Sequence, residues 1–128
     1  MKNFEKVVSH LTNLGIAVTK TIPEDGMVVV DDESKGFCNL VIDCEDPILV
    51  VEQRLVKVEN VDTEKLTKLL TANRSLVHGA FCLDEESYVI FKDTLQLENL
   101  DENEVAGTLN ALTLALVEHG EMLVSLTK

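Results

Sequence analysis

The sequence has 128 residues, of which 45% are hydrophobic and 27% charged, so we expect one globular domain over residues 1–128. Its 11 basic and 23 acidic residues give a net charge of −12, which disfavours binding to nucleic acids and to anionic membrane surfaces. The sequence shows neither a signal-peptide pattern nor a membrane-spanning apolar run, and its three cysteines are an odd number. We therefore expect a cytoplasmic protein.

The first predicted element is a helix over residues 2–14. Apolar residues recur there at helical spacing, at Phe4, Val7, Val8, Leu11 and Leu14. Gly15 follows at a position where helices often end in a left-handed residue. This pattern predicts a helix with one buried face.

Residues 16–58 predict β-strands separated by turn sequences. The strands are expected at 16–22, 27–30, 37–43 and 48–58, with turns at 23–26, 31–36 and 45–47. Strict alternation in the third strand would place Leu40 and Ile42 on one face together with Cys38, and Phe37 on the other face with Asn39 and Val41. Turn signals at this spacing indicate an antiparallel meander of three or four strands.

A second helix is predicted from Asp62 or Thr63 to about residue 75, with a stripe of Leu66, Leu69 and Leu70. Two strands, 78–83 and 88–97, follow it across the turn at residues 84–87. The strands occur in hairpins and do not alternate singly with helices. The fold class is therefore α+β, with the order α-β-β-β-α-β-β-α, space for a fourth strand before the second helix, and an antiparallel sheet in a two-layer sandwich.

The last predicted element is a long helix over residues 101–126. Asp101 and Glu104 form an acidic capping box, and apolar residues cover more than half of the helix circumference. Such a helix is expected to be buried on more than one side, and so to contribute to a dimer or partner surface. The residues predicted for this interface are Leu112, Leu116, Met122 and Leu123.

The sequence contains no pattern that indicates a cofactor or a metal. Cys38, Cys44, Cys82 and His78 form no metal-ligand spacing, and apolar neighbours suggest that the cysteines are small core residues. The scattered glycines exclude a phosphate-binding loop, and the carboxylate runs 31–33 and 84–86 are typical of solvated turns. The polar group Asn73-Arg74 with His78-Gly79 is interpreted as a helix end and a strand entry, and alternatively as a partner contact.

The segment Leu69 to Leu100 resembles a known family. Its LLTANR helix end, its HGAFCLDEE strand and turn, and its KDTLQLENL segment before a leucine-rich helix are similar to the bacterial YjfI-type family of unknown function. The order of elements over nearly the whole chain also resembles the type III secretion chaperones of the Tir-chaperone type. This second resemblance implies a secretion-chaperone-like sandwich and a small, acidic homodimer that binds an extended client segment without nucleotide.

We therefore expect a non-enzymatic, cytoplasmic, chaperone-like module that binds a protein partner as a homodimer. The first alternative is a regulatory adaptor that binds a membrane-stress protein of the phage-shock-protein-A kind. A remote alternative is an enzyme that uses Cys82 and His78, which would require the fold to bring these two side chains together in a cleft.

Overall fold

The computed structural model describes residues 2–128, which form three α-helices and a six-stranded antiparallel sheet. The helices are α1 (Lys2–Asn13), α2 (Thr63–Ala72) and α3 (Glu102–Ser125). The strands are β1 (Val18–Ile22), β2 (Met27–Asp32), β3 (Phe37–Glu45), β4 (Ile48–Lys57), β5 (Ala80–Leu83) and β6 (Tyr88–Gln96). The fourth strand before the second helix is present, and the predicted α+β order is confirmed.

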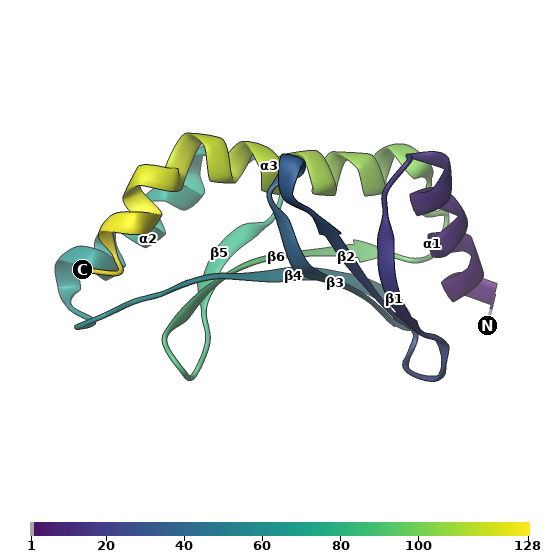
Figure 1. The fold of residues 1–128 in the computed structure, drawn as a ribbon, viewed down its shortest axis with the longest axis horizontal. Coiled ribbons are helices and arrows are strands. Elements are labelled where there is room, and N and C mark those ends of the chain that lie inside the picture. Colours follow the sequence, from purple (N-terminus) through teal and green to yellow (C-terminus); the bar gives the residue numbers. More distant parts are fainter. Residues whose placement is uncertain (1) are drawn as a thin grey trace.

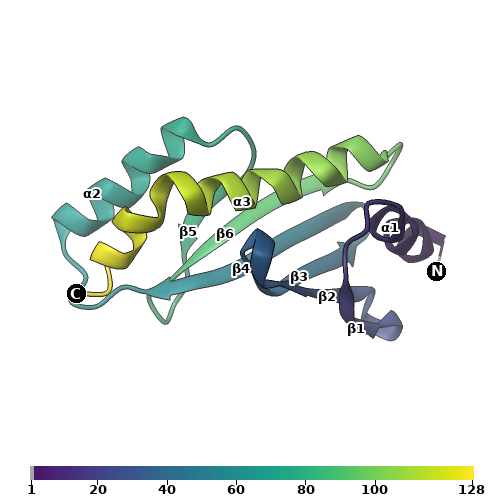
Figure 2. The same cartoon turned by 45° about the horizontal axis from the view of Figure 1, so that its top comes forward.

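The molecule has two layers, because all three helices lie on one side of the sheet (Figure 1). The strand order is β1-β2-β3-β4-β6-β5, and every neighbouring pair is antiparallel. Figure 2 shows α3 crossing the sheet, with α1 near its N-terminal end and α2 along its C-terminal half. The opposite face of the sheet carries no helix from the described chain.

Local sequence determines where α1 ends and where α3 begins. Gly15 has a φ of 72°, and Ile16 N–H donates to the carbonyl of Leu11, so α1 ends as predicted. The capping box at α3 is also confirmed, since Asp101 accepts from Glu104 N–H and Glu104 accepts from Asp101 N–H. The 24 residues of α3 give an unbroken helix about 36 Å long.

The core lies between the helices and the sheet and is built mainly from leucine and valine. Each central strand contributes alternate residues to it, and these residues are almost fully buried: Val28, Val30, Leu40, Ile42, Leu49, Val51, Val89 and Phe91. The helices supply the facing layer, with Val7 and Leu11 from α1 and Leu112 from α3. A hydrogen bond also joins the two layers: the hydroxyl of buried Thr108 in α3 donates to the Asp93 carboxylate in β6 at 2.7 Å.

The predicted alternation at the start of the third strand is wrong, because β3 contains a bulge. Pairing with β2 advances from Val30↔Leu40 to Asp32↔Phe37, so β3 uses one residue more than β2. Asn39, with a φ of 49°, lies in this bulge. Phe37 therefore joins Leu40 and Ile42 in the core.

The remaining differences from the predicted elements are at strand ends. Strand β1 begins at Val18, two residues after the predicted start, and β5 begins at Ala80, also two residues late. In the second case Gly79 has a φ of 76°, a left-handed conformation that does not continue a strand. None of the helices within residues 2–128 is long and apolar enough to cross a membrane.

Candidate functional site

The four residues predicted for an interface lie at different depths on α3. Leu112 and Leu123 are 0% and 3% exposed, so they hold the helix against the core of the chain. Leu116 and Met122 are partly buried at the margins of the same face. Leu116 packs closely on the β2–β3 hairpin, because a Cβ placed on Gly36 would lie 2.6 Å from its Cδ1.

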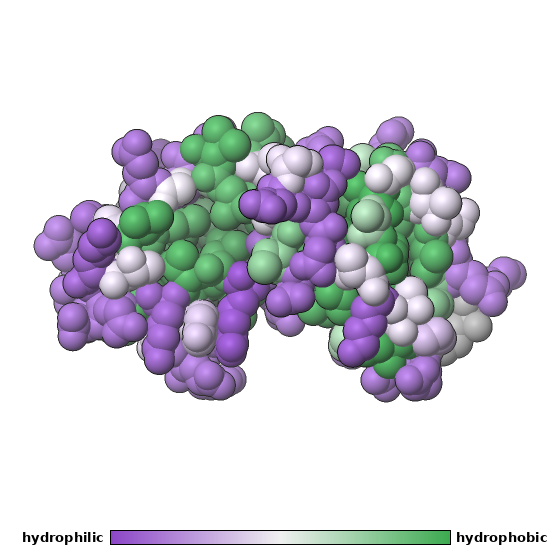
Figure 3. Space-filling view, viewed as in Figure 1, coloured by the Kyte–Doolittle hydropathy of each residue, from purple (hydrophilic) through white to green (hydrophobic). Residues whose placement is uncertain are grey.

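The outward side of α3 carries other apolar residues that are exposed. Leu114, Val117 and Val124 are 53%, 76% and 54% exposed, and their spacing of three and seven residues places them on one side of the helix. Val77, which is 80% exposed, lines a small hollow together with Leu114. We call these four residues the α3 patch. Figure 3, viewed as in Figure 1, shows apolar surface along the C-terminal half of α3, on the left of the molecule.

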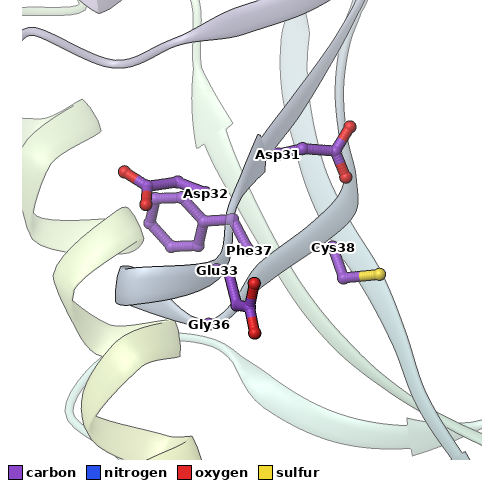
Figure 4. Close-up of a pocket in the computed structure, with 6 residues that line it drawn as sticks. All are labelled: Asp31, Asp32, Glu33, Gly36, Phe37 and Cys38. Atoms are coloured by element: carbon purple, nitrogen blue, oxygen red, sulfur yellow. The ribbon is translucent and has the colours of Figure 1, made fainter.

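A cavity of about 510 Å³ opens beside the β2–β3 hairpin. It is lined by Asp31, Asp32, Glu33, Gly36, Phe37 and Cys38. Figure 4 shows that Asp31 and Cys38 point to one side of the hairpin, whereas Asp32 and Phe37 point to the other. The cavity is thus a hollow around a surface turn whose side chains do not converge on one point.

Two of the carboxylates that line this cavity, Asp31 and Asp32, already have partners. Asp31 accepts from Asn39 N–H at 2.7 Å and from the Thr19 hydroxyl at 2.9 Å, and these bonds lower its pKa. Asp32 accepts from the hydroxyl and the N–H of Ser34, and the hydroxyl bond is the main cause of its lowered pKa. These two groups shape the turn, as expected for a solvated acidic run.

Cys82 and His78 are not brought together. No hydrogen bond joins them in the described part of the chain, and His78 lines a hollow at the start of α3 that Cys82 does not reach. Among residues 2–128, His, Cys, Asp and Glu side chains form no group of three or more that could hold a metal ion. The chemistry required by the remote enzyme alternative is therefore not assembled by this fold.

The prediction that the cysteines are core residues is wrong for two of them. Cys38 and Cys82 are exposed. Cys38 lies at the β3 bulge, and the neighbouring Phe37 is buried in its place. Cys82 alternates with buried Phe81 in β5, so its thiol points away from the core. Cys44 is partly buried, and burial raises the pKa of its thiol to about 11.

The polar group at the end of α2 has a structural role. The Asn73 carboxamide accepts from Phe81 N–H at 2.7 Å and donates to the Phe81 carbonyl at 3.2 Å, so it binds the edge of β5 as a neighbouring strand would. Gly79 is the strand entry, as interpreted from the sequence, and a Cβ there would lie 2.5 Å from Phe91.

The sequence analysis missed Asp43, which lies on the sheet face that no helix covers. One of its carboxylate oxygens is buried and has no hydrogen-bond partner among the described residues. Burial, the neighbouring Glu45 carboxyl, Asp25 and Glu52 raise the pKa of Asp43 to about 6. The alternation of charged and apolar residues in 41–52 was the available signal, but only the register brings these carboxylates together.

Comparison with known proteins gives one family and several solved structures. A family model described as CesT_Tir_1 matches residues 1–128, whereas no curated protein sequence matches the chain. The structure of YbjN from E. coli, described as a candidate transcription regulator, has a TM-score of 0.71 at 13% identity and covers 92% of this chain and 91% of YbjN.

Two structures that include secretion chaperones share the fold. The HopA1–SchA chaperone–effector complex contains a chain with a TM-score of 0.61 at 14% identity, covering 90% of this chain and 93% of that one. The Yersinia pestis type III secretion chaperone SycH, in complex with a fragment of YscM2, gives 0.58 at 16% identity, with coverage of 94% and 98%. At these identities the likeness establishes the fold alone.

Proposed function

Because the chain belongs to the CesT_Tir_1 family of type III secretion chaperones, we propose that it is a non-enzymatic, cytoplasmic protein-binding module that acts as a homodimer on a protein partner. Its fold is that of chaperones solved in complex with an effector or with a fragment of another protein. The strongly acidic surface, with a net charge of −12, also favours protein partners over nucleic acids.

The observation that carries the homodimer is the α3 patch. Single exposed apolar residues are ordinary, but a contiguous set that continues from one element to another marks an interaction surface. Val77 and Leu114 line a shared hollow, and Val117 and Val124 add exposed apolar side chains along α3, with the exposed Glu118 and Glu121 between them. A second copy that packs its own patch here would bury the side of α3 that the chain itself leaves uncovered.

The residues predicted from sequence divide into two groups under this proposal. Leu116 and Met122, which are partly exposed, border the proposed interface. Leu112 and Leu123 act indirectly, because they fix α3 on the sheet and so determine which side of it faces outward. Catalysis is left out of the proposal, since the family is one of chaperones, two of the similar structures include chaperones, and the Cys82–His78 pair is not assembled.

A second candidate is a regulatory adaptor that holds a membrane-stress protein of the phage-shock-protein-A kind. The structural likeness to YbjN, described as a candidate transcription regulator, favours regulation as a function that this fold can carry. The acidic surface makes direct DNA binding unfavourable, so such an adaptor would act through a protein. Pull-down with a phage-shock-A-like protein and with secreted clients separates the two candidates.

Sedimentation velocity with two matched variants tests the homodimer. Val117→Asp places a charge in the patch at a position 76% exposed, so we expect a folded monomer where the wild type is a dimer. Leu112→Ala, in the core of the same helix, should lower thermal stability without changing the oligomeric state of the molecules that remain folded. A monomeric wild type, or a dimer that persists in Val117→Asp, would overturn this interface.

A further inference from the structure

The face of the sheet opposite the helices is apolar as well as uncovered. Strand residues that alternate with the buried core set point to this side and are all partly exposed: Met27, Val29, Val41, Ile48 and Val50. We call this surface, together with the carboxylates between these residues, the open sheet face. Figure 3 shows this side of the molecule hollowed between the β1–β2 turn and the β5–β6 turn.

The strand register intersperses carboxylates with these apolar side chains. Asp43 is the direct cross-strand partner of Met27 and of Val50, and Val41 faces both Val29 and Glu52. Direct partners on one face have Cβ atoms about 5 Å apart, so each carboxylate touches apolar neighbours. Glu45, beside Ile48, and Asp25, in the β1–β2 turn, complete the acidic set.

These carboxylates are not neutralised by the chain itself. No ion pair within 4.0 Å involves Asp25, Asp43, Glu45 or Glu52 among residues 2–128. Two lysines lie on the same face, Lys92 opposite Glu52 and Lys20 opposite Val29, and neither makes such a pair. At the other end of the face, Arg54 Nη2 forms an ion pair with Asp84 Oδ2 at 2.8 Å. The Arg54 guanidinium carbon also lies 4.1 Å from the centroid of the Tyr88 ring.

We propose that the open sheet face binds an extended segment of the client in which apolar side chains and lysine or arginine side chains project to the same side. The assignment rests on the proposed chaperone function and names the chemistry of the segment. It stands on the uncovered apolar face, on four carboxylates that make no ion pair among residues 2–128, and on the Asp43 Oδ1 oxygen that has no hydrogen-bond partner there.

An extended segment suits the spacing of this face. Alternate residues of an extended chain project to the same side about 7 Å apart, which is also the distance between alternate residues along a strand. A client residue above Val41 or Val50 would be apolar, and the next residue on the same side would reach Asp43 or Glu52. A lysine or arginine there would relieve the repulsion among Asp43, Glu45, Asp25 and Glu52.

Fluorescence anisotropy with designed peptides tests the assignment. The probe is a labelled peptide of about twelve residues, about 40 Å when extended, with valine and lysine alternating at every second position and serine between them. We expect saturable binding to the wild type, and none when glutamate replaces lysine or serine replaces valine. The double variant Asp43→Asn/Glu52→Gln should bind the probe about fivefold more weakly.

A matched control separates local from overall charge. Glu59→Gln/Glu85→Gln makes the same change in net charge after β4 and on the β5–β6 turn, outside both proposed surfaces, and should bind the probe like the wild type. Binding of the wild type should also weaken from pH 7.5 to pH 5, because Asp43, close to Glu45, Asp25 and Glu52, then takes up a proton. The lysines on the same face are Lys92, opposite Glu52, and Lys20, opposite Val29.

Three results would overturn the assignment: no binding of the probe, equal binding by both double variants, or equal binding of the lysine and glutamate peptides. Each would leave the proposed function standing if the wild type sediments as a homodimer and retains a protein partner. Loss of the homodimer with probe binding intact would instead contradict the proposed function and retain the open sheet face as a peptide site.

Discussion

The ionised carboxylate of Asp43 lowers the stability of the folded chain but is the form that would bind a lysine or arginine of the proposed client segment. A carboxyl that ionises normally at pH 3.8 is held among apolar and acidic neighbours, and its pKa is raised to about 6. The folded chain therefore binds this proton more tightly than the unfolded chain. The stabilising contribution of the protonated group is complete below pH 3.8 and is lost as the pH rises through about 6.

Asp43→Asn should consequently stabilise the protein at neutral pH. A pKa raised from 3.8 to about 6 corresponds to about 3 kcal/mol for a fully buried group. Asp43 is partly exposed, which reduces this effect, so we expect Asp43→Asn to raise the free energy of unfolding at pH 7 by about 1 kcal/mol. The gain should vanish near pH 4 in urea titrations at both pH values. Glu85→Gln, in an exposed turn, is the control for net charge. A gain that persists at pH 4 would contradict the role assigned to Asp43.

Gly79 and Gly120 are expected to respond oppositely to alanine. At Gly79 a Cβ would lie 2.5 Å from the Phe91 ring in a left-handed backbone, so Gly79→Ala should cost about 2–4 kcal/mol. At Gly120, inside α3, a Cβ meets nothing within 4 Å, so Gly120→Ala should add roughly 0.5–1 kcal/mol. Thermal unfolding of both variants measures this difference, and a stable Gly79→Ala protein would refute the close approach.

At the scale of elements, β3 and β4 are joined beyond their paired residues by one side chain. Gln53 is 4% exposed, donates to the Gly36 carbonyl and accepts from Cys38 N–H, each at 3.0 Å. Strand pairing between β3 and β4 ends at Val41↔Glu52, so this carboxamide continues the connection across the bulge.

Gln53→Met should therefore destabilise the hairpin, because it leaves a buried N–H and a buried carbonyl without their partner. We expect a loss of about 1–3 kcal/mol in the free energy of unfolding, together with faster hydrogen exchange at Cys38. Gln96→Met, at an exposed position of β6, is the matched control and should change stability little. Unchanged exchange at Cys38 would contradict this role of Gln53.

The elements could be predicted from sequence because their signals are local. The spacing of apolar residues predicted the helices, and turn sequences predicted where the strands separate. Gly15 indicated the end of α1, and the Asp101–Glu104 pair indicated the start of α3. The β3 bulge escaped prediction because a left-handed Asn39 has no sequence pattern of its own, and it reversed the predicted positions of Phe37 and Cys38. The cluster of carboxylates around Asp43 was not predicted, because only the pairing register of β2, β3 and β4 brings these residues together.

At the scale of the whole molecule, the two layers leave two uncovered surfaces with different chemistry. The α3 patch is apolar and belongs to the helical layer, whereas the open sheet face combines apolar and acidic side chains on the other layer. The resemblance to Tir-type secretion chaperones is confirmed by the family match over residues 1–128. Two opposite surfaces would allow a homodimer to form through one layer while each copy binds a client segment on the other.

Native mass spectrometry of the protein purified together with its partner from the native host is the most direct test of a homodimer acting on a protein partner. Each chain has a mass of 14.2 kDa. The account predicts a complex of two copies of the chain with one partner polypeptide, and a free homodimer when the partner is removed. A single 14.2 kDa chain with no second polypeptide would contradict it.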